Sequence, residues 1–122
     1  MNENDNSYYN PDQLRKLQEQ GVIIPDLSTV KIGREVAAEK ISTGSTIHPF
    51  VRINGSKTEI HAGANIGMSG PATLDNSWIG ENVVVGSLGA VTLKDTVVGP
   101  GSILGSGVAE QAVLLGKETM VN

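Results

Sequence analysis

The chain contains no cysteine among its 122 residues. Disulfides, thiolate zinc sites and cysteine nucleophiles are therefore excluded. Aromatic residues make up only 3% of the sequence, although aromatic side chains supply much of the buried area of an ordinary core. Because 39% of the residues are nevertheless hydrophobic, we expect a core built from Ile, Val, Leu and Ala.

Clusters of basic residues and long apolar runs are also missing. The net charge is −4, and nucleic-acid binding is not expected because contacts to phosphate require clustered Lys and Arg. No apolar run approaches the length of a membrane span, and the polar, acidic start MNENDNSYYN does not fit a signal peptide. We expect a cytoplasmic protein that binds neither nucleic acid nor a membrane.

The N-terminal part of the chain predicts a tail followed by one short helix. Residues 1–9 have no hydrophobic periodicity, and we expect them to be disordered. In the stretch 10–21, NPDQLRKLQEQG, Asn10 can cap a helix, Pro11 suits its first position and Gly21 can end it. This helix has one narrow apolar edge and is marginal alone, so we expect it to cap the unit that follows.

From residue 22 onward the chain has an internal repeat. Aliphatic residues recur at spacings of six, six and seven, which gives a period of 19 residues. The first column contains Ile41, Ile60, Ile79 and Val98, the second Ile47, Ile66, Val85 and Leu104, and the third Ile53, Ala72 and Val91. A fixed short period is typical of a solenoid whose repeats stack on one another.

Three aliphatic positions per period predict three short strands per coil. We therefore expect an all-β solenoid, a parallel β-helix of about five 19-residue coils, with glycine and other small residues at the corners. The β-helix domain is expected over 22–116, with an irregular first coil over 22–40 and a tail over 117–122.

The pattern [Ile/Val/Leu]-Gly-x-x-small-x over 32–109 resembles the hexapeptide repeat of left-handed parallel β-helices, found in acyltransferases and sugar-nucleotide enzymes. The phrases IGMSGPATLDNSWIGENVVV and GSGVAEQAVLLGKE are similar to the β-helical region of bacterial UDP-N-acetylglucosamine diphosphorylase-like proteins. This resemblance implies left-handed coils, a homotrimer, and a module of a sugar-nucleotide-pathway transferase of acyl or nucleotidyl type. Its ligands would be a sugar nucleotide and acetyl-CoA or another acyl carrier.

Two observations limit that expectation. Nucleotidyltransferase motifs are absent from the chain, and titratable residues are scarce inside the coils. The alternative function is a non-catalytic scaffold, a β-helix used for oligomerisation or interaction.

The only histidines, His48 in IHPF and His61 in IHAG, each follow an inward aliphatic residue. They fall in different columns, on different sides of the solenoid, so they cannot share a metal ion and no metal site is expected. The resembling acyltransferases use a histidine as general base between neighbouring prisms, which makes both histidines catalytic candidates. His61 is the better candidate because it lies in the regular coils. No carboxylate is clearly placed to orient either ring, and the alternative is that both merely fill corner slots.

Trp78, the only tryptophan, falls in one column with Glu59 and Val97. This column directly precedes an inward position, so we expect Trp78 outside the solenoid. Exposed tryptophan is enriched at interfaces, and Trp78 is a candidate interface residue. The alternative is shielding by the chain's own N-terminal segment.

Overall fold

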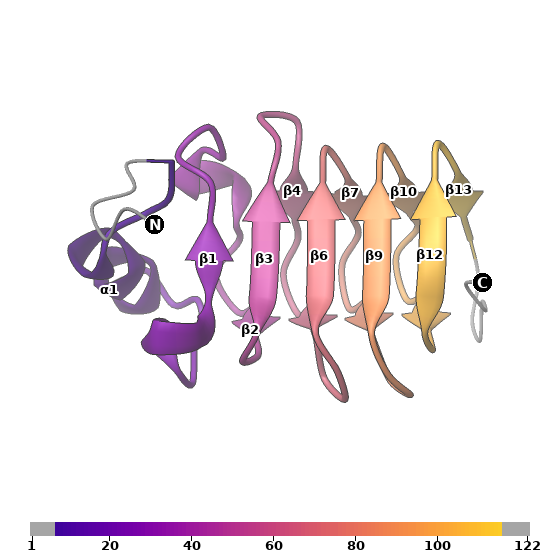
Figure 1. Ribbon diagram of the computed structural model, residues 1–122, viewed down its shortest axis with the longest axis horizontal. Coiled ribbons are helices and arrows are strands. Elements are labelled where there is room, and N and C mark those ends of the chain that lie inside the picture. The colour runs from indigo at the N-terminus through magenta and orange to yellow at the C-terminus, as the bar shows by residue number, and fades with distance from the viewer. Residues whose placement is uncertain (1–6, 116–122) are drawn as a thin grey trace.

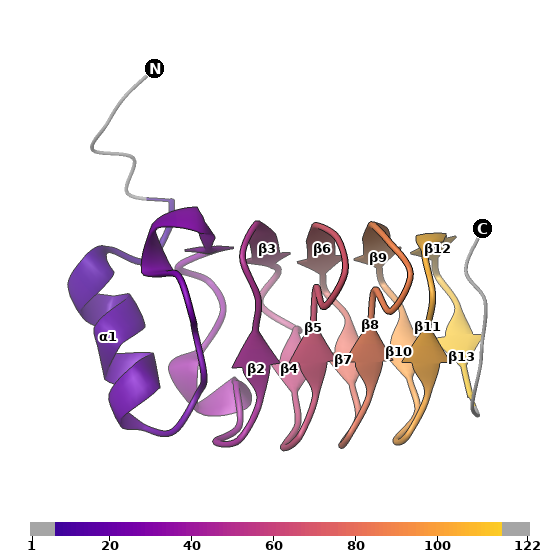
Figure 2. The same cartoon turned by 90° about the horizontal axis from the view of Figure 1, so that it is seen from below.

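The computed structural model describes residues 7–115, which form a parallel β-solenoid of about four turns with one α-helix at its N-terminal end (Figure 1). Three parallel sheets form its sides, and the ends of the described chain lie at opposite ends of the solenoid (Figure 2). The solenoid prediction is confirmed. The regular coils are fewer than the five expected, because the first coil is irregular.

The strands are short, and their bounds follow the three sides. Sheet 1 contains β1 (Lys31–Ile32), β3 (Val51–Asn54), β6 (Ala72–Asp75), β9 (Val91–Lys94) and β12 (Gly107–Glu110). Sheet 2 contains β2 (Thr46–Ile47), β5 (Asn65–Ile66), β8 (Val84–Val85) and β11 (Ile103–Leu104). Sheet 3 contains β4 (Glu59–Ile60), β7 (Trp78–Ile79), β10 (Val97–Val98) and β13 (Val113–Leu114).

The first coil has one regular strand, β1. Two short 3₁₀ helices, η1 (Leu27–Thr29) and η2 (Ala38–Lys40), replace regular strands there. Only isolated parallel bridges, Ile23 to Thr46 and Ile41 to Ile60, continue the other two sides.

The first two predicted columns are confirmed by the strand register. Ile60 pairs with Ile79, and Ile79 with Val98; the second column pairs in the same way through β2, β5, β8 and β11. All eight side chains of these columns are buried. Stacked aliphatic residues at a fixed position therefore form the core, as the composition indicated.

The third predicted column is wrong at its first member. Ala72 pairs with Val91 as expected, but Ile53 pairs with Leu74, and Val51 takes the place opposite Ala72. The loop between β2 and β3 is two residues shorter than the loop between β5 and β6, and the following loop, 55–58, is two residues longer than its counterpart. The two differences cancel, so the 19-residue period persists while the strand is shifted by two residues.

A ladder of buried hydroxyls follows sheet 1 at its corner with sheet 3. Thr58, Ser77 and Thr96 are all nearly inaccessible to solvent. The backbone N–H of Ser77 donates to Thr58 Oγ1 at 3.2 Å, and that of Thr96 donates to Ser77 Oγ at 3.3 Å. Each hydroxyl also donates to a backbone carbonyl. The corner can therefore be buried without unsatisfied polar groups.

Another corner repeats a left-handed backbone conformation in successive coils. Gly44, Gly63, Asn82 and Gly101 are 19 residues apart and have φ values of 86°, 79°, 58° and 77°. Glycine adopts this conformation without steric cost, and asparagine tolerates it better than most residues. The abundance of glycine is thus explained in part by the turns between sides.

Helix α1 (Pro11–Glu19) packs over the first coil. Asn10 and Gln13 form a reciprocal capping box, and Gly21 has a φ of 101° just beyond the helix, so the predicted start and end signals are confirmed. Leu14 and Leu17 are buried in the shared core. No helix within residues 7–115 is long and apolar enough to cross a membrane.

Residues 7–9, which were expected to belong to a disordered tail, are paired with β1. Tyr8 forms an antiparallel bridge with Gly33, and Tyr9 N–H donates to the Ile32 carbonyl at 2.8 Å. The rest of that expected tail, residues 1–6, and the expected tail 117–122 lie outside the described residues.

The Tyr9 phenol predicts a loss of stability in alkaline solution. Its hydroxyl donates to the Val36 carbonyl, and burial, aided by Glu39 and Glu35, raises the pKa of Tyr9 above its ordinary value of 10.0. The unfolded chain then ionises first, so this stabilisation is complete below about pH 10 and is lost as pH rises through the folded value. We expect urea titrations to show a steeper alkaline loss for wild type than for Tyr9→Phe, which also loses about 1 kcal/mol at neutral pH. Equal alkaline losses would contradict this.

Candidate functional site

The two histidines lie on different sides of the solenoid, as the columns predicted. His48 follows β2 of sheet 2, whereas His61 follows β4 of sheet 3. Both occupy the same backbone role in their coils, since His48 N–H donates to the Ile66 carbonyl and His61 N–H to the Ile79 carbonyl, each at 3.0 Å. The glycines at the matching positions make the same bonds. The corner-slot interpretation is therefore correct for the backbone, and the side chains decide whether there is more.

His61 is surrounded by two side chains that suit chemistry. Its Nε2 lies 3.4 Å from Glu59 Oε1, and its ring centroid lies 4.7 Å from that of Trp78 at an interplanar angle of 48°. The Nε2 atom is buried and makes no hydrogen bond with any described residue. An unpartnered buried nitrogen is unusual in a folded protein. The imidazole is thus held between a carboxylate and an aromatic wall, with a ring nitrogen directed at the carboxylate.

The expectation that no carboxylate is placed to orient His61 is wrong. Glu59 is outward on β4, and His61 is two residues further along the chain. In extended backbone, residues i and i+2 point to the same face, so the spacing alone could have identified this pair. Trp78 joins it because β7 pairs Trp78 directly with Glu59.

Trp78 lies on the outer side of sheet 3, as expected from its column. The outward positions of the next two strands are Val97 and Val113, which pair in register with Trp78 and with each other and are 40% and 65% exposed. We call the row Trp78, Val97 and Val113 the outer apolar row. A flat sheet face that exposes aliphatic side chains in consecutive strands is a typical contact surface. The His61–Glu59 pair lies at its N-terminal end.

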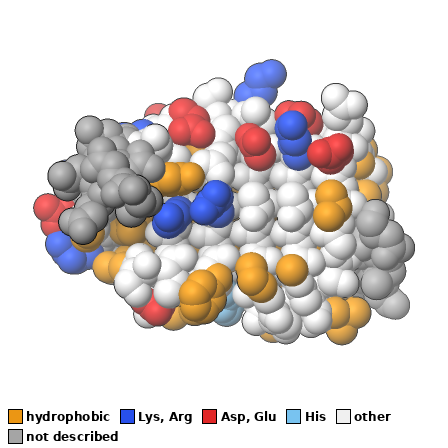
Figure 3. Space-filling view, viewed as in Figure 1, with side chains coloured by type: hydrophobic (Ala, Val, Ile, Leu, Met, Phe, Trp, Pro, Cys, Tyr) orange, Lys and Arg blue, Asp and Glu red, His pale blue; other side chains and the backbone are white. Residues whose placement is uncertain are grey.

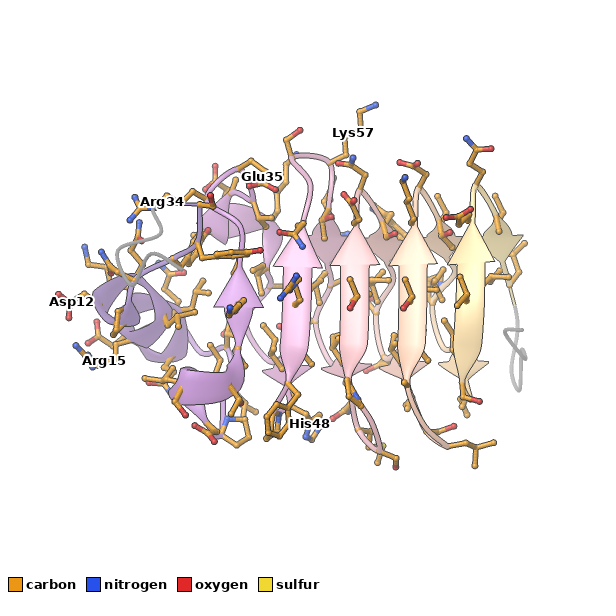
Figure 4. The ribbon with its side chains drawn as sticks, in the orientation of Figure 1. Asp12, Arg15, Arg34, Glu35, His48 and Lys57 are labelled. Carbon is orange, nitrogen blue, oxygen red and sulfur yellow. The ribbon has the colours of Figure 1, made fainter. Side chains whose placement is uncertain are left out.

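His48 has a different environment. Its Nε2 lies 3.2 Å from Asn65 Oδ1, in the next coil of sheet 2. Figure 4 places His48 at the lower edge of the solenoid, far from Arg34 and Glu35 at the upper edge. An amide can fix the ring orientation but cannot stabilise an imidazolium as a carboxylate does. The structure therefore favours His61 over His48, in agreement with the order expected from the sequence.

The described residues offer carboxylates and imidazoles mainly as isolated groups. Within residues 7–115 no three of His, Asp or Glu come close enough together to hold a metal ion. The contact of His61 with Glu59 and the pair of Arg15 with Asp12 on α1 are the ion pairs of this part of the chain. Comparison of the chain with protein-family models, curated proteins and solved structures finds no match.

Proposed function

We propose that the chain is a left-handed β-helical module of a sugar-nucleotide-pathway transferase, and that it self-associates through the outer apolar row to form a ligand cleft at His61. One observation supports this most strongly. An imidazole with a carboxylate at 3.4 Å lies at the end of an exposed apolar row on a single sheet face. Three copies is the number that the resemblance to hexapeptide proteins implies.

In this proposal Glu59 and His61 divide the work of a general base. Glu59 accepts the proton on Nε2 of His61, which leaves Nδ1 as the basic nitrogen. Nδ1 then takes a proton from a substrate hydroxyl or amine as it attacks an acyl group, and Glu59 stabilises the imidazolium that forms. Trp78 restricts the ring to one orientation by packing against it.

A non-catalytic scaffold is the second candidate function, and the same row supports it. Trp78 and the two valines can bind another copy whether or not His61 reacts. In that case His61 serves only as the lateral support of Trp78. Ligand binding and the effect of His61 on it distinguish the two functions.

Calorimetric titration with acetyl-CoA and with UDP-N-acetylglucosamine tests the proposal. We expect wild type to bind at least one of them, and His61→Asn to lower the rate of acyl transfer by about 10²–10⁴-fold while retaining the ligand. His48→Asn is the matched control and should leave both unchanged. Binding of neither ligand would contradict the transferase module and leave the scaffold.

A further inference from the structure

Two cationic side chains lie next to each other on the outer face of sheet 1. Lys31 of β1 and Arg52 of β3 are direct partners in the strand register, and both are exposed. Figure 3 shows them as a compact blue patch over β1 and β3. Like charges directly opposite each other on neighbouring strands are destabilising, so this pairing requires an explanation in a chain of net charge −4.

No carboxylate of the described chain neutralises this pair. Within residues 7–115 the ion pairs are Arg15 with Asp12 and His61 with Glu59. Other cations on the molecule do have polar partners: Arg34 Nε donates to the Tyr8 carbonyl at 3.0 Å, and Lys40 Nζ donates to the Ser56 carbonyl at 3.1 Å. The cationic groups of Lys31 and Arg52 contact an aromatic ring instead.

That ring belongs to Tyr8. Lys31 Nζ lies 5.4 Å and Arg52 Cζ 5.9 Å from its centroid. The backbone of Tyr8 is fixed by its antiparallel bridge to Gly33. One ring therefore holds both cations in place without cancelling their charge.

A second aromatic side chain, Phe50, borders the same patch under strain. It precedes β3, has a φ of 65° and is 66% exposed. This left-handed conformation is rare for a bulky residue, and such strain is found most often at functional sites. Burial does not compensate for it here, because most of the ring is in solvent.

The groove between these groups has a defined lining. Thr29, Lys31, Phe50, Val51 and Arg52 enclose about 220 Å³. The groove is not a consequence of the repeat, since the positions that pair with Arg52 in the next two coils are Thr73 and Thr92. Its volume suits one ring or one phosphate-bearing group rather than a large ligand.

We propose that this groove binds a small nucleotide, with its phosphate on Lys31 and Arg52 and its planar base against Phe50. Arginine forms paired hydrogen bonds to phosphate oxygens, and lysine adds a second charge. Bases stack on exposed aromatic faces irrespective of their sequence identity. The groove lies on sheet 1, whereas His61 lies on sheet 3, so this site is independent of the function proposed above.

Calorimetry of the full chain at low salt, with three probes, tests the proposal. Adenosine 5′-monophosphate supplies ring and phosphate, adenosine the ring alone, and inorganic phosphate the anion alone. We expect the nucleotide to bind more tightly than either half, and its affinity to fall as salt rises. Arg52→Thr, which introduces the residue present in the next two coils, should weaken binding about tenfold or more.

Two further variants separate binding from folding. Phe50→Asn removes the ring but introduces a residue that tolerates the left-handed conformation, so it should weaken nucleotide binding while the melting temperature stays equal or rises. Lys94→Gln, on the same sheet face between Asp75 and Glu110, should leave binding unchanged. The proposal is overturned if the nucleotide does not bind, binds no better than phosphate, or binds Arg52→Thr as well as wild type.

Discussion

Replacing Ile79 with alanine is expected to lower the free energy of unfolding by about 2–5 kcal/mol. Ile79 is fully buried and stacks between Ile60 and Val98 in the first aliphatic column. In a solenoid each repeat contacts only its neighbours, so a cavity at this position disturbs the two interfaces that hold the central coils together. Close packing leaves little room for neighbouring side chains to fill the space.

Urea unfolding followed by circular dichroism measures this loss. Val97→Ala is the matched control, because Val97 lies on the outer face of the adjacent strand and is 40% exposed. We expect the control to cost less than about 1 kcal/mol. A similar cost for the two variants would mean that the interior of the solenoid is not the source of its stability.

Replacing Trp78 with lysine is expected to convert the proposed oligomer to single chains. Trp78 begins the outer apolar row, and a lysine there would bring like charges together in a contact between copies. The chain should remain folded, because Ile79, the inward residue of the same strand, is unchanged. We expect light scattering to give the mass of one chain for this variant and circular dichroism to give the wild-type spectrum.

Val108→Lys is the control for that variant. Val108 is 51% exposed but belongs to β12 of sheet 1, away from the outer apolar row. It changes charge and exposed apolar area in a comparable way, so the mass should stay at the wild-type value. Dissociation by both variants would point to a general effect of added charge rather than to this surface.

The sequence predicted most of the fold because inward positions in a solenoid accept only a narrow range of residues. The columns through Ile60 and Ile66 have one aliphatic choice per coil, and both were assigned correctly. The third column had two choices in one strand, since Val51 and Ile53 are both buried and aliphatic. The period could not decide between them, because the loop lengths that set the register compensate for each other.

The candidate site was harder to predict than the fold. His61 was identified, but its partner Glu59 was missed because the sequence was analysed by coil column rather than by the two-residue alternation within a strand. The cationic groove was missed for another reason: Lys31 and Arg52 are 21 residues apart rather than 19. Only the register shift of β3 brings them into direct opposition.

The mass of the wild-type protein in solution is the most direct test of the proposed self-association at His61. Light scattering over a range of concentrations should give three times the 12.8 kDa of one chain. A mass of one chain at every concentration would contradict the account, because the outer apolar row would then face solvent and His61 would have no cleft.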